Sequence, residues 1–145
     1  MSYSIAIDGP AGAGKSTIAK KLATKMNYIY VDTGAMYRAM AVYFSQNNTN
    51  PEDEAAINKG VENVDINIEY LDGIQQVILN GENVTGLLRK EETGRMASKT
   101  SKYASVRTKL VELQRKLANS TDVIMDGRDI GTTVLPNAFV KIYLT

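Results

Sequence analysis

The sequence contains no histidine and no cysteine among its 145 residues. These two absences exclude a Ser-His-Asp triad, a cysteine nucleophile, a zinc site built from histidine or cysteine, and a thiol redox pair. The chemistry that remains belongs to carboxylates, hydroxyls, lysine and arginine. Phosphoryl transfer needs only such groups, because its catalysis is mostly positioning and charge neutralisation by backbone N–H groups, lysine, arginine and Mg²⁺.

The sequence also lacks an excess of one charge and a long apolar run. Lysine and arginine together number 17, and aspartate and glutamate 16, which gives a net charge of +1. This balance does not suit a protein that coats nucleic acid, and no run reaches the ~20 apolar residues that span a bilayer. Since the first eight residues lack the basic and apolar regions of a signal peptide, we expect a cytoplasmic protein without nucleic-acid or membrane partners.

The order of the predicted elements indicates an α/β fold. A strand at 4–8 leads into a glycine-rich stretch, and a helix begins at Lys15 with Ile18, Leu22 and Met26 on one face. Strands that alternate with helices predict a parallel sheet. The later elements of this kind are a strand at 28–31, a helix at 35–44, two helices within 90–119, and strands at 122–125 and 139–144.

Two stretches between these elements have patterns of their own. Asn50-Pro51 predicts a helix start, with the asparagine as the cap and the proline in the first turn. Residues 64–79 alternate between apolar and polar types on either side of Asp72-Gly73, which predicts a β-hairpin, with a third short strand near Val84. The predicted architecture is a central parallel sheet flanked by helices, with a small antiparallel insertion.

The stretch from Gly9 to Ser16 matches the P-loop pattern G-x-x-x-x-G-K-[ST] between a predicted strand and a predicted helix. Glycines let backbone N–H groups approach phosphate oxygens, and the helix points its positive end at the same anion. Lys15 would neutralise phosphate charge, and Ser16 would ligate Mg²⁺. The alternative is a glycine-rich turn without a ligand. The predicted ATP-binding residues are Gly9, Pro10, Ala11, Gly12, Ala13, Gly14, Lys15, Ser16 and Thr17.

A second metal ligand is predicted at the end of the strand at 122–125. Asp126 follows an apolar strand, which is the Walker-B arrangement that holds Mg²⁺ beside a P-loop. Taken alone the signal is weak, because many strands end in an aspartate that forms a turn. Together with the P-loop it favours a functional metal ligand. A P-loop by itself indicates that a nucleoside triphosphate binds, not which reaction follows.

Further polar residues are predicted at the same edge of the sheet, where open α/β folds bind ligands. Thr33 and Arg38 follow the second strand, Arg128 and Asp129 follow the third, and Arg107 lies on the helix between them. Converging arginines favour an anion, and an acidic residue among them favours a ligand that donates hydrogen bonds, such as an exocyclic amine. The alternative for any one arginine is a solvated surface charge.

Five segments together resemble the bacterial cytidylate kinase family, in order and over almost the whole chain. The last of them differs from adenylate kinases and from the eukaryotic uridylate-cytidylate kinases, which carry Asp-Gly-Phe-Pro-Arg there. The resemblance implies transfer from ATP to CMP or dCMP, giving ADP and CDP or dCDP, with Mg²⁺ and a monomeric enzyme. The five segments are 9–17, 32–38, 97–99, 106–107 and 126–132.

The resemblance also implies roles for single residues. Arg38 and Arg128 would hold the CMP phosphate, and Ser98, Arg107 and Asp129 would contact the cytosine. Asp129 can accept a hydrogen bond from the cytosine 4-amino group, a pairing that uracil would reverse. In the same way, Thr33 would line the CMP pocket, Lys15, Asp126 and Arg128 would be catalytic, and Ser16 and Asp126 would hold the metal.

The resemblance implies one P-loop kinase core over 1–145, incomplete, in which 33–107 form a monophosphate-binding insertion with a hairpin near 64–84. Members of the family continue with an arginine-rich lid and an adenine-binding segment, so we expect the complete protein to carry the activity and residues 1–145 alone to be nearly inactive. Two alternatives remain: a P-loop kinase of another acceptor, such as shikimate, gluconate or another nucleoside monophosphate, and a nucleotide-binding module without an acceptor.

Overall fold

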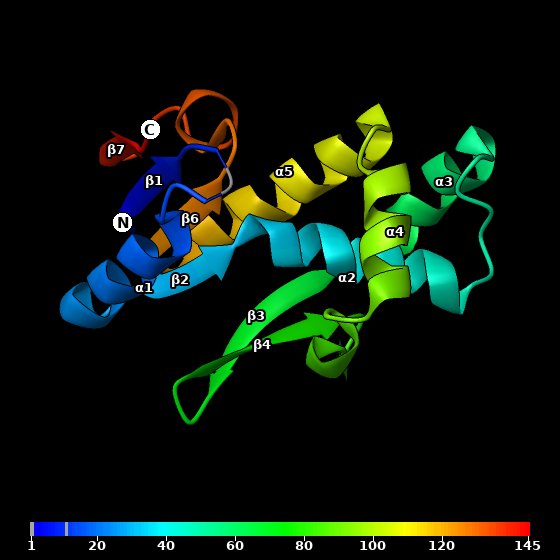
Figure 1. Cartoon of the computed structure of the whole chain (residues 1–145), viewed down its shortest axis with the longest axis horizontal. Helices are drawn as coiled ribbons and strands as arrows, with labels where there is room; N and C mark the ends of the chain where they lie inside the picture. The colour runs from blue at the N-terminus through cyan, green and yellow to red at the C-terminus, as the bar shows by residue number, and fades with distance from the viewer. Residues whose placement is uncertain (1, 11) are drawn as a thin grey trace. The chain divides into compact units, whose positions relative to one another are not determined.

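A computed structural model describes residues 2–10 and 12–145. The chain divides into two compact units (Figure 1). The first, called here the P-loop unit, consists of Met1–Thr33 and Gln114–Thr145; the second, called here the hairpin unit, is Gly34–Leu113. No helix among the described residues is both long and apolar enough to cross a membrane.

The P-loop unit contains a four-stranded parallel sheet in the order β2-β6-β1-β7. The strands are β1 (Ser4–Asp8), β2 (Ile29–Asp32), β6 (Val123–Gly127) and β7 (Val140–Tyr143). The central strands are apolar and buried along most of their length, as parallel strands covered on both faces are. The parallel sheet that the sequence predicts is confirmed.

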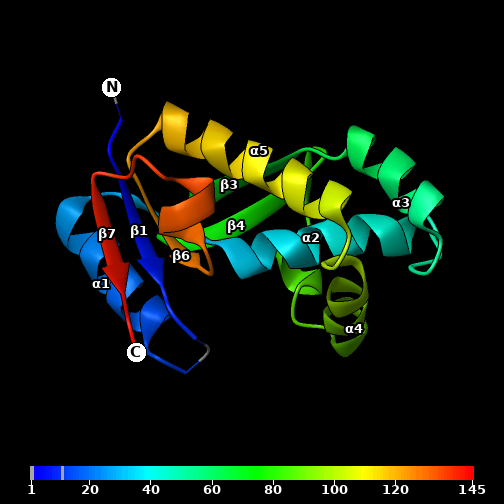
Figure 2. The ribbon, with the colours of Figure 1, turned by 90° about the horizontal axis from the view of Figure 1, so that it is seen from above.

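Helix α1 (Lys15–Met26) lies against this sheet (Figure 2). It packs on the sheet through its alanines. Ala19 and Ala23 form one buried cluster with residues of β1, β2 and β6, and Leu22 is partly buried against it. Ile18 is 38% exposed and Met26 is 42% exposed. The predicted apolar face of this helix is therefore wrong by about one position, because small side chains let the helix backbone approach the sheet more closely than isoleucine or methionine would.

Helix α2 (Thr33–Gln46) begins directly after β2, two residues earlier than the sequence predicts. Met36, Met40 and Phe44 are fully buried along one side of it, at the spacing of a core-facing helix. Helix α3 (Glu54–Gly60) follows, and then the short 3₁₀ helix η1 (Val61–Asn63).

The predicted cap of α3 is wrong. Asp53 is the N-cap, and its side chain accepts a hydrogen bond from the Ala56 N–H at 3.2 Å. The Asn50 side chain instead accepts from the Glu52 N–H at 2.9 Å, which closes a turn ahead of the helix. Pro51 therefore lies in that turn and not in the first turn of the helix.

The hairpin unit contains a separate antiparallel sheet in the order β3-β4-β5. Its strands are β3 (Ile66–Leu71), β4 (Ile74–Leu79) and β5 (Glu82–Asn83). Asp72 (φ 53°) and Gly73 (φ 77°) both lie in the left-handed region, as a two-residue hairpin turn requires. The predicted hairpin is confirmed, and the third strand ends just before Val84.

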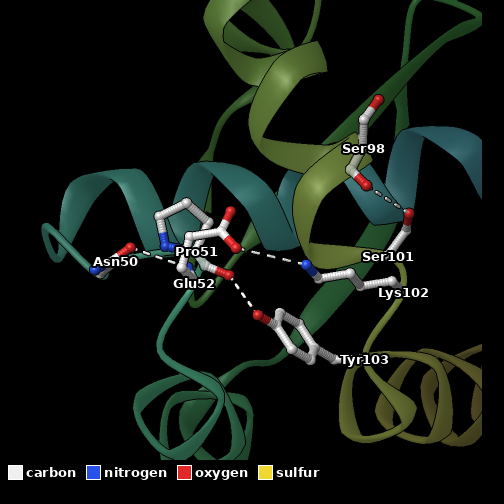
Figure 3. Close-up of polar contacts among 7 residues, drawn as sticks. All are labelled: Asn50, Pro51, Glu52, Ser98, Ser101, Lys102 and Tyr103. Atoms are coloured by element: carbon white, nitrogen blue, oxygen red, sulfur yellow. Dashed lines mark hydrogen bonds and ion pairs between the residues drawn. The ribbon is translucent and has the colours of Figure 1, made fainter.

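Two more helices follow the 3₁₀ helix η2 (Thr85–Leu87): α4 (Glu91–Thr100) and α5 (Ala104–Ser120). Figure 3 shows how the loop between α4 and α5 holds the loop before α3 within the hairpin unit. The Tyr103 hydroxyl donates to the Pro51 carbonyl at 2.6 Å, and the Lys102 ammonium lies 3.7 Å from the Glu52 carboxylate. A short π-helical turn, η3 (Ile130–Val134), follows β6 in the P-loop unit.

Candidate active site

The P-loop lies between β1 and α1, where the sequence predicts it. Gly9 has φ 151°, and a side chain on it would collide with the Leu144 carbonyl oxygen. Gly14, with φ 89°, is the N-cap of α1. The helix therefore begins from a left-handed backbone conformation, which glycine adopts without strain. The predicted Ala11 lies outside the described residues.

The start of α1 is suited to an anion. Gly14 provides no side-chain cap, and the first turn of the helix contains no acidic residue. The N–H groups at the start of a helix have no partner within the helix, and together with the helix dipole they attract negative charge. Lys15, which opens the helix, donates from Nζ to the Pro10 carbonyl at 3.0 Å, so the ammonium group lies over the glycine-rich loop.

Asp126 provides a buried carboxylate at the end of β6, 5% exposed. The Tyr30 hydroxyl donates to its Oδ2 at 2.8 Å, and Asp32 is its register partner on β2. Burial raises the pKa of Asp126 to about 6; the Asp32 carboxylate adds to this rise, whereas the Tyr30 hydrogen bond, Lys15 and Lys20 oppose it. A cation beside this carboxyl would favour its ionised form.

Thr33 lies close to Asp126. It is buried, and its hydroxyl donates to the Asp126 backbone carbonyl at 2.8 Å. A side chain on Gly127 would collide with the same hydroxyl. The end of β6 is therefore packed directly against the start of α2.

Arg128 and Asp129 follow β6 and are both exposed. Asp129 has φ 60° and is the N-cap residue of η3, with its carbonyl accepting from the Thr133 N–H at 2.9 Å and the Val134 N–H at 3.2 Å. The structure thus brings Arg128, Asp129, Thr33 and Asp126 into the same unit as the P-loop.

Three other residues that the sequence predicts to bind the acceptor substrate lie in the hairpin unit. All three are exposed: Arg38 on α2, Ser98 on α4 and Arg107 on α5. The Ser98 carbonyl accepts from the Ser101 hydroxyl at 3.3 Å (Figure 3). Burial raises the pKa of Tyr37, and the Arg107 guanidinium opposes that rise. Arg107 is therefore near the Tyr37 hydroxyl within this unit.

Sequence reasoning missed three residues of the parallel strands: Asp8 and Asp32, which end β1 and β2, and Tyr30 within β2. Asp8, at the end of β1, accepts hydrogen bonds from two N–H groups of η3, and Tyr30 and Asp32 interact with Asp126 from β2. The two aspartates carry a signal that could have found them, since each is a carboxylate at the end of an apolar strand. Nothing in the sequence around Tyr30 marks it as the partner of a carboxylate 96 positions away.

The comparisons with known proteins agree with this arrangement. The family model for cytidylate kinase matches residues 5–145. The chain belongs to the cytidylate kinase family. Relatives named cytidylate kinase include a protein of Caldicellulosiruptor bescii, 54% identical over 97% of this chain, one of Carboxydothermus hydrogenoformans, 51% identical over 97%, and one of Leuconostoc mesenteroides, 50% identical over 99%.

The chain is shorter than these members of the family. It spans 62% of the length of the Caldicellulosiruptor protein and 64% of the length of each of the other two. The match nevertheless covers both units, because it runs from β1 to the last residue of the chain. The P-loop, the Asp126 carboxylate and the acceptor residues predicted from the sequence all lie within the matched range.

Proposed function

We propose that the complete protein transfers the γ-phosphoryl group of ATP to CMP or dCMP, giving ADP and CDP or dCDP, as a cytoplasmic monomer. The observation that carries this proposal is a P-loop that opens α1 beside the buried Asp126 carboxylate, in a chain matched by the cytidylate kinase family model from residue 5 to 145. In this proposal residues 33–107 form the monophosphate-binding insertion.

The residues present fit Mg²⁺. Asp32 and Asp126 are register partners, and both burial and the Asp32 carboxylate oppose the charge on Asp126, so a divalent cation would stabilise the ionised form of Asp126. Among the described residues no group of three or more potential ligands gathers. Proteins hold Mg²⁺ mostly through one or two carboxylates plus substrate phosphates and water. Ser16 and Asp126 are the proposed ligands, and the ion would neutralise charge on the transferring phosphoryl group.

Different groups of the protein bind the two substrates. The N–H groups at the start of α1 and the Lys15 ammonium bind the ATP phosphates. Arg38 and Arg128 bind the CMP phosphate, while Ser98, Arg107 and Asp129 read the cytosine and Thr33 lines the pocket. The attacking group is a phosphate oxygen that is already ionised at neutral pH, so the reaction needs no general base, which agrees with a chain without histidine.

A coupled assay of ADP release tests the proposal on the full-length protein, with ATP, Mg²⁺ and a panel of acceptors. CMP and dCMP are expected to accelerate ADP release, and UMP and AMP to do so far less. A different acceptor that succeeds where CMP and dCMP fail would indicate a P-loop kinase of another class. ATP binding without any effective acceptor would indicate a nucleotide-binding module.

Two lysine variants of α1 serve as a matched pair in the same assay. Lys15→Met is expected to abolish transfer without unfolding the protein, because Lys15 lies at a helix start outside the buried cluster. Lys25→Met, in the last turn of the same helix, removes the same charge at the opposite end and is expected to leave the rate within about twofold. Equal losses in both variants would contradict the proposed role of Lys15.

A further inference from the structure

The short turn η3, which follows Arg128 and Asp129, is held at both ends by charged side chains from distant parts of the P-loop unit. Asp8, the last residue of β1, accepts from the Ile130 N–H at 2.7 Å through Oδ1 and from the Gly131 N–H at 2.9 Å through Oδ2. Both oxygens of one carboxylate therefore bind the N-terminal end of η3. Figure 2 shows this orange turn beside β6.

Arg115 of α5 binds the opposite end. Its Nε donates to the Val134 carbonyl at 2.9 Å and its Nη2 donates to the Thr133 carbonyl at 2.7 Å. A carboxylate on the N–H groups and a guanidinium on the carbonyl groups match the polarity of the helical turn. The pair Asp8 and Arg115 is called here the η3 clasp.

The residue directly before the turn is itself bonded to the turn. Asp129 is held in the left-handed region (φ 60°), with its carbonyl bonded to two N–H groups of η3. Gly131 lies so close to Asp8 that an added Cβ would be 3.3 Å from Asp8 Oδ2 and 3.2 Å from the Lys141 side chain. Aspartate adopts the left-handed region more readily than most residues other than glycine, as Asp72 does in the hairpin turn.

Asp8 also connects this turn to the P-loop. It directly precedes Gly9, and its own carbonyl accepts from the Leu144 N–H at 2.8 Å. Its side chain reaches the segment after Asp126, whose strand pairs with β1 in the register Asp8 to Gly127. Asp8 is thus bonded through its backbone to the sheet beside the P-loop. Through its side chain it is bonded to η3, the turn that follows Arg128 and Asp129.

We infer that Asp8 and Arg115 are positioning residues that fix Arg128 and Asp129 for the acceptor nucleotide. The inference rests on the proposed function, because it assigns these two residues to CMP. Neither Asp8 nor Arg115 needs to touch a substrate for this role. The expected signature is a defect confined to the acceptor, with the P-loop and its affinity for ATP preserved.

The test compares Asp8→Asn, Arg115→Gln and a matched control, Asp122→Asn, in the full-length protein. Asp122 also accepts a backbone N–H, that of Tyr3 at 2.6 Å, but it precedes β6 and so lies at the other end of the sheet. In Asp8→Asn an amide NH₂ replaces one acceptor oxygen and faces an N–H donor. We expect the KM for CMP to rise about tenfold, the loss typical of one misplaced charge-assisted contact. The KM for ATP should stay within about twofold.

Arg115→Gln is expected to raise the KM for CMP in the same direction, and Asp122→Asn to lower stability without changing either KM. Amide hydrogen exchange gives a readout independent of turnover: the Ile130 and Gly131 N–H groups should exchange faster in Asp8→Asn than in the unsubstituted protein or in Asp122→Asn. Equal KM changes for CMP and ATP, the same CMP defect in Asp122→Asn, or unchanged exchange at Ile130 and Gly131 would each overturn the inference.

Failure of the proposed function is distinguishable from failure of the clasp. If the unsubstituted protein binds ATP but not CMP by calorimetry, the proposed function and the assignment of the clasp to CMP are both overturned. If the unsubstituted protein binds CMP and Asp8→Asn binds it equally well, only the positioning inference is overturned. Faster exchange together with weaker CMP binding in Asp8→Asn supports both.

Discussion

Asp126 is a single buried carboxyl whose surroundings predict a pH-dependent stability. Its pKa in the folded protein is raised from its ordinary value of 3.8 to about 6, mainly by burial. The folded state therefore holds a proton that the unfolded state releases between these two values, and the free energy of unfolding falls as pH rises through that window. At ~1.4 kcal/mol per unit, the loss between pH 4 and pH 7 is up to about 3 kcal/mol.

Urea unfolding across this pH range, in the presence of EDTA, measures the effect. Asp126→Asn removes the charge at nearly constant shape. We therefore expect the variant to lack the contribution of Asp126 to the pH dependence and to be more stable than the unsubstituted protein above pH 6. Asp122→Asn serves as the control and should keep the pH dependence. A pH profile of Asp126→Asn parallel to that of the unsubstituted protein would contradict the assignment.

The Tyr30 hydroxyl is predicted to favour the ionised form of the same carboxyl. Tyr30→Phe removes the 2.8 Å hydrogen bond to Asp126 and leaves a buried carboxylate with one partner fewer, at a cost of about 1–3 kcal/mol above pH 6. Because this hydrogen bond lowers the pKa of Asp126, the midpoint of the pH transition should move upward in the variant. A midpoint that moves downward would show that the bond favours the protonated carboxyl.

Residue patterns were informative where the functional group and its context are contiguous in sequence. The place of the P-loop could be predicted because the whole motif lies in one segment between a strand and a helix; the roles of Lys15 and Ser16 toward ATP and Mg²⁺ stay predictions. The contacts of Asp8 with η3 join residues 122 and 123 positions apart, and no local pattern encodes them. The sequence shows that Asp8 ends an apolar strand, but its hydrogen-bond partners depend on the pairing of β6 with β1.

At the scale of elements, the sequence predicted which elements form but not always which face they bury. In α5 the apolar residues that recur every three or four positions are buried, as the spacing of a core-facing helix predicts; they are Val106, Leu110, Leu113 and Leu117. In α1 the alanines are buried in place of the larger apolar residues. The helix lies so close to the sheet that small side chains fit between them better than large ones. The cap of α3 was misplaced because Asn50 and Asp53 are both good caps, and the backbone decides between them.

The corrected face of α1 can be tested with two substitutions in adjacent positions. Ala19→Leu should destabilise the protein by about 1–3 kcal/mol, because Ala19 is fully buried against the sheet and a larger side chain overpacks it. Ile18→Ala should cost less than about 1 kcal/mol, since Ile18 is 38% exposed. Thermal or urea unfolding measures both; the reverse order would restore the face predicted from the sequence.

Over the chain as a whole, the residues predicted to bind CMP are divided between the two units. Thr33, Arg128 and Asp129 belong to the P-loop unit, and Arg38, Ser98 and Arg107 belong to the hairpin unit. The sequence could place these residues on their elements, because each motif lies at a strand end or on a helix, whereas their contacts with CMP stay predictions. The division of the chain into the two units follows from long-range packing that the motifs do not encode.

Asp129→Ala is predicted to weaken the binding of CMP much more than the binding of ATP. Loss of an acceptor for the cytosine 4-amino group should reduce CMP binding by about 1–3 kcal/mol while the P-loop stays intact. Isothermal titration calorimetry with each nucleotide measures the two affinities. Thr133→Ala, which removes an exposed side chain from the same turn, serves as the control and should change neither affinity. Equal losses for CMP and ATP in Asp129→Ala would contradict a base-reading role.

The most direct test is a product analysis of the full-length protein incubated with ATP, Mg²⁺ and CMP. Mass spectrometry of the nucleotides should show CDP and ADP accumulating in equal amounts, with no free phosphate released. Formation of ADP and phosphate while CMP remains unchanged would contradict the account, because the chain would then hydrolyse ATP without transferring its phosphoryl group to the acceptor.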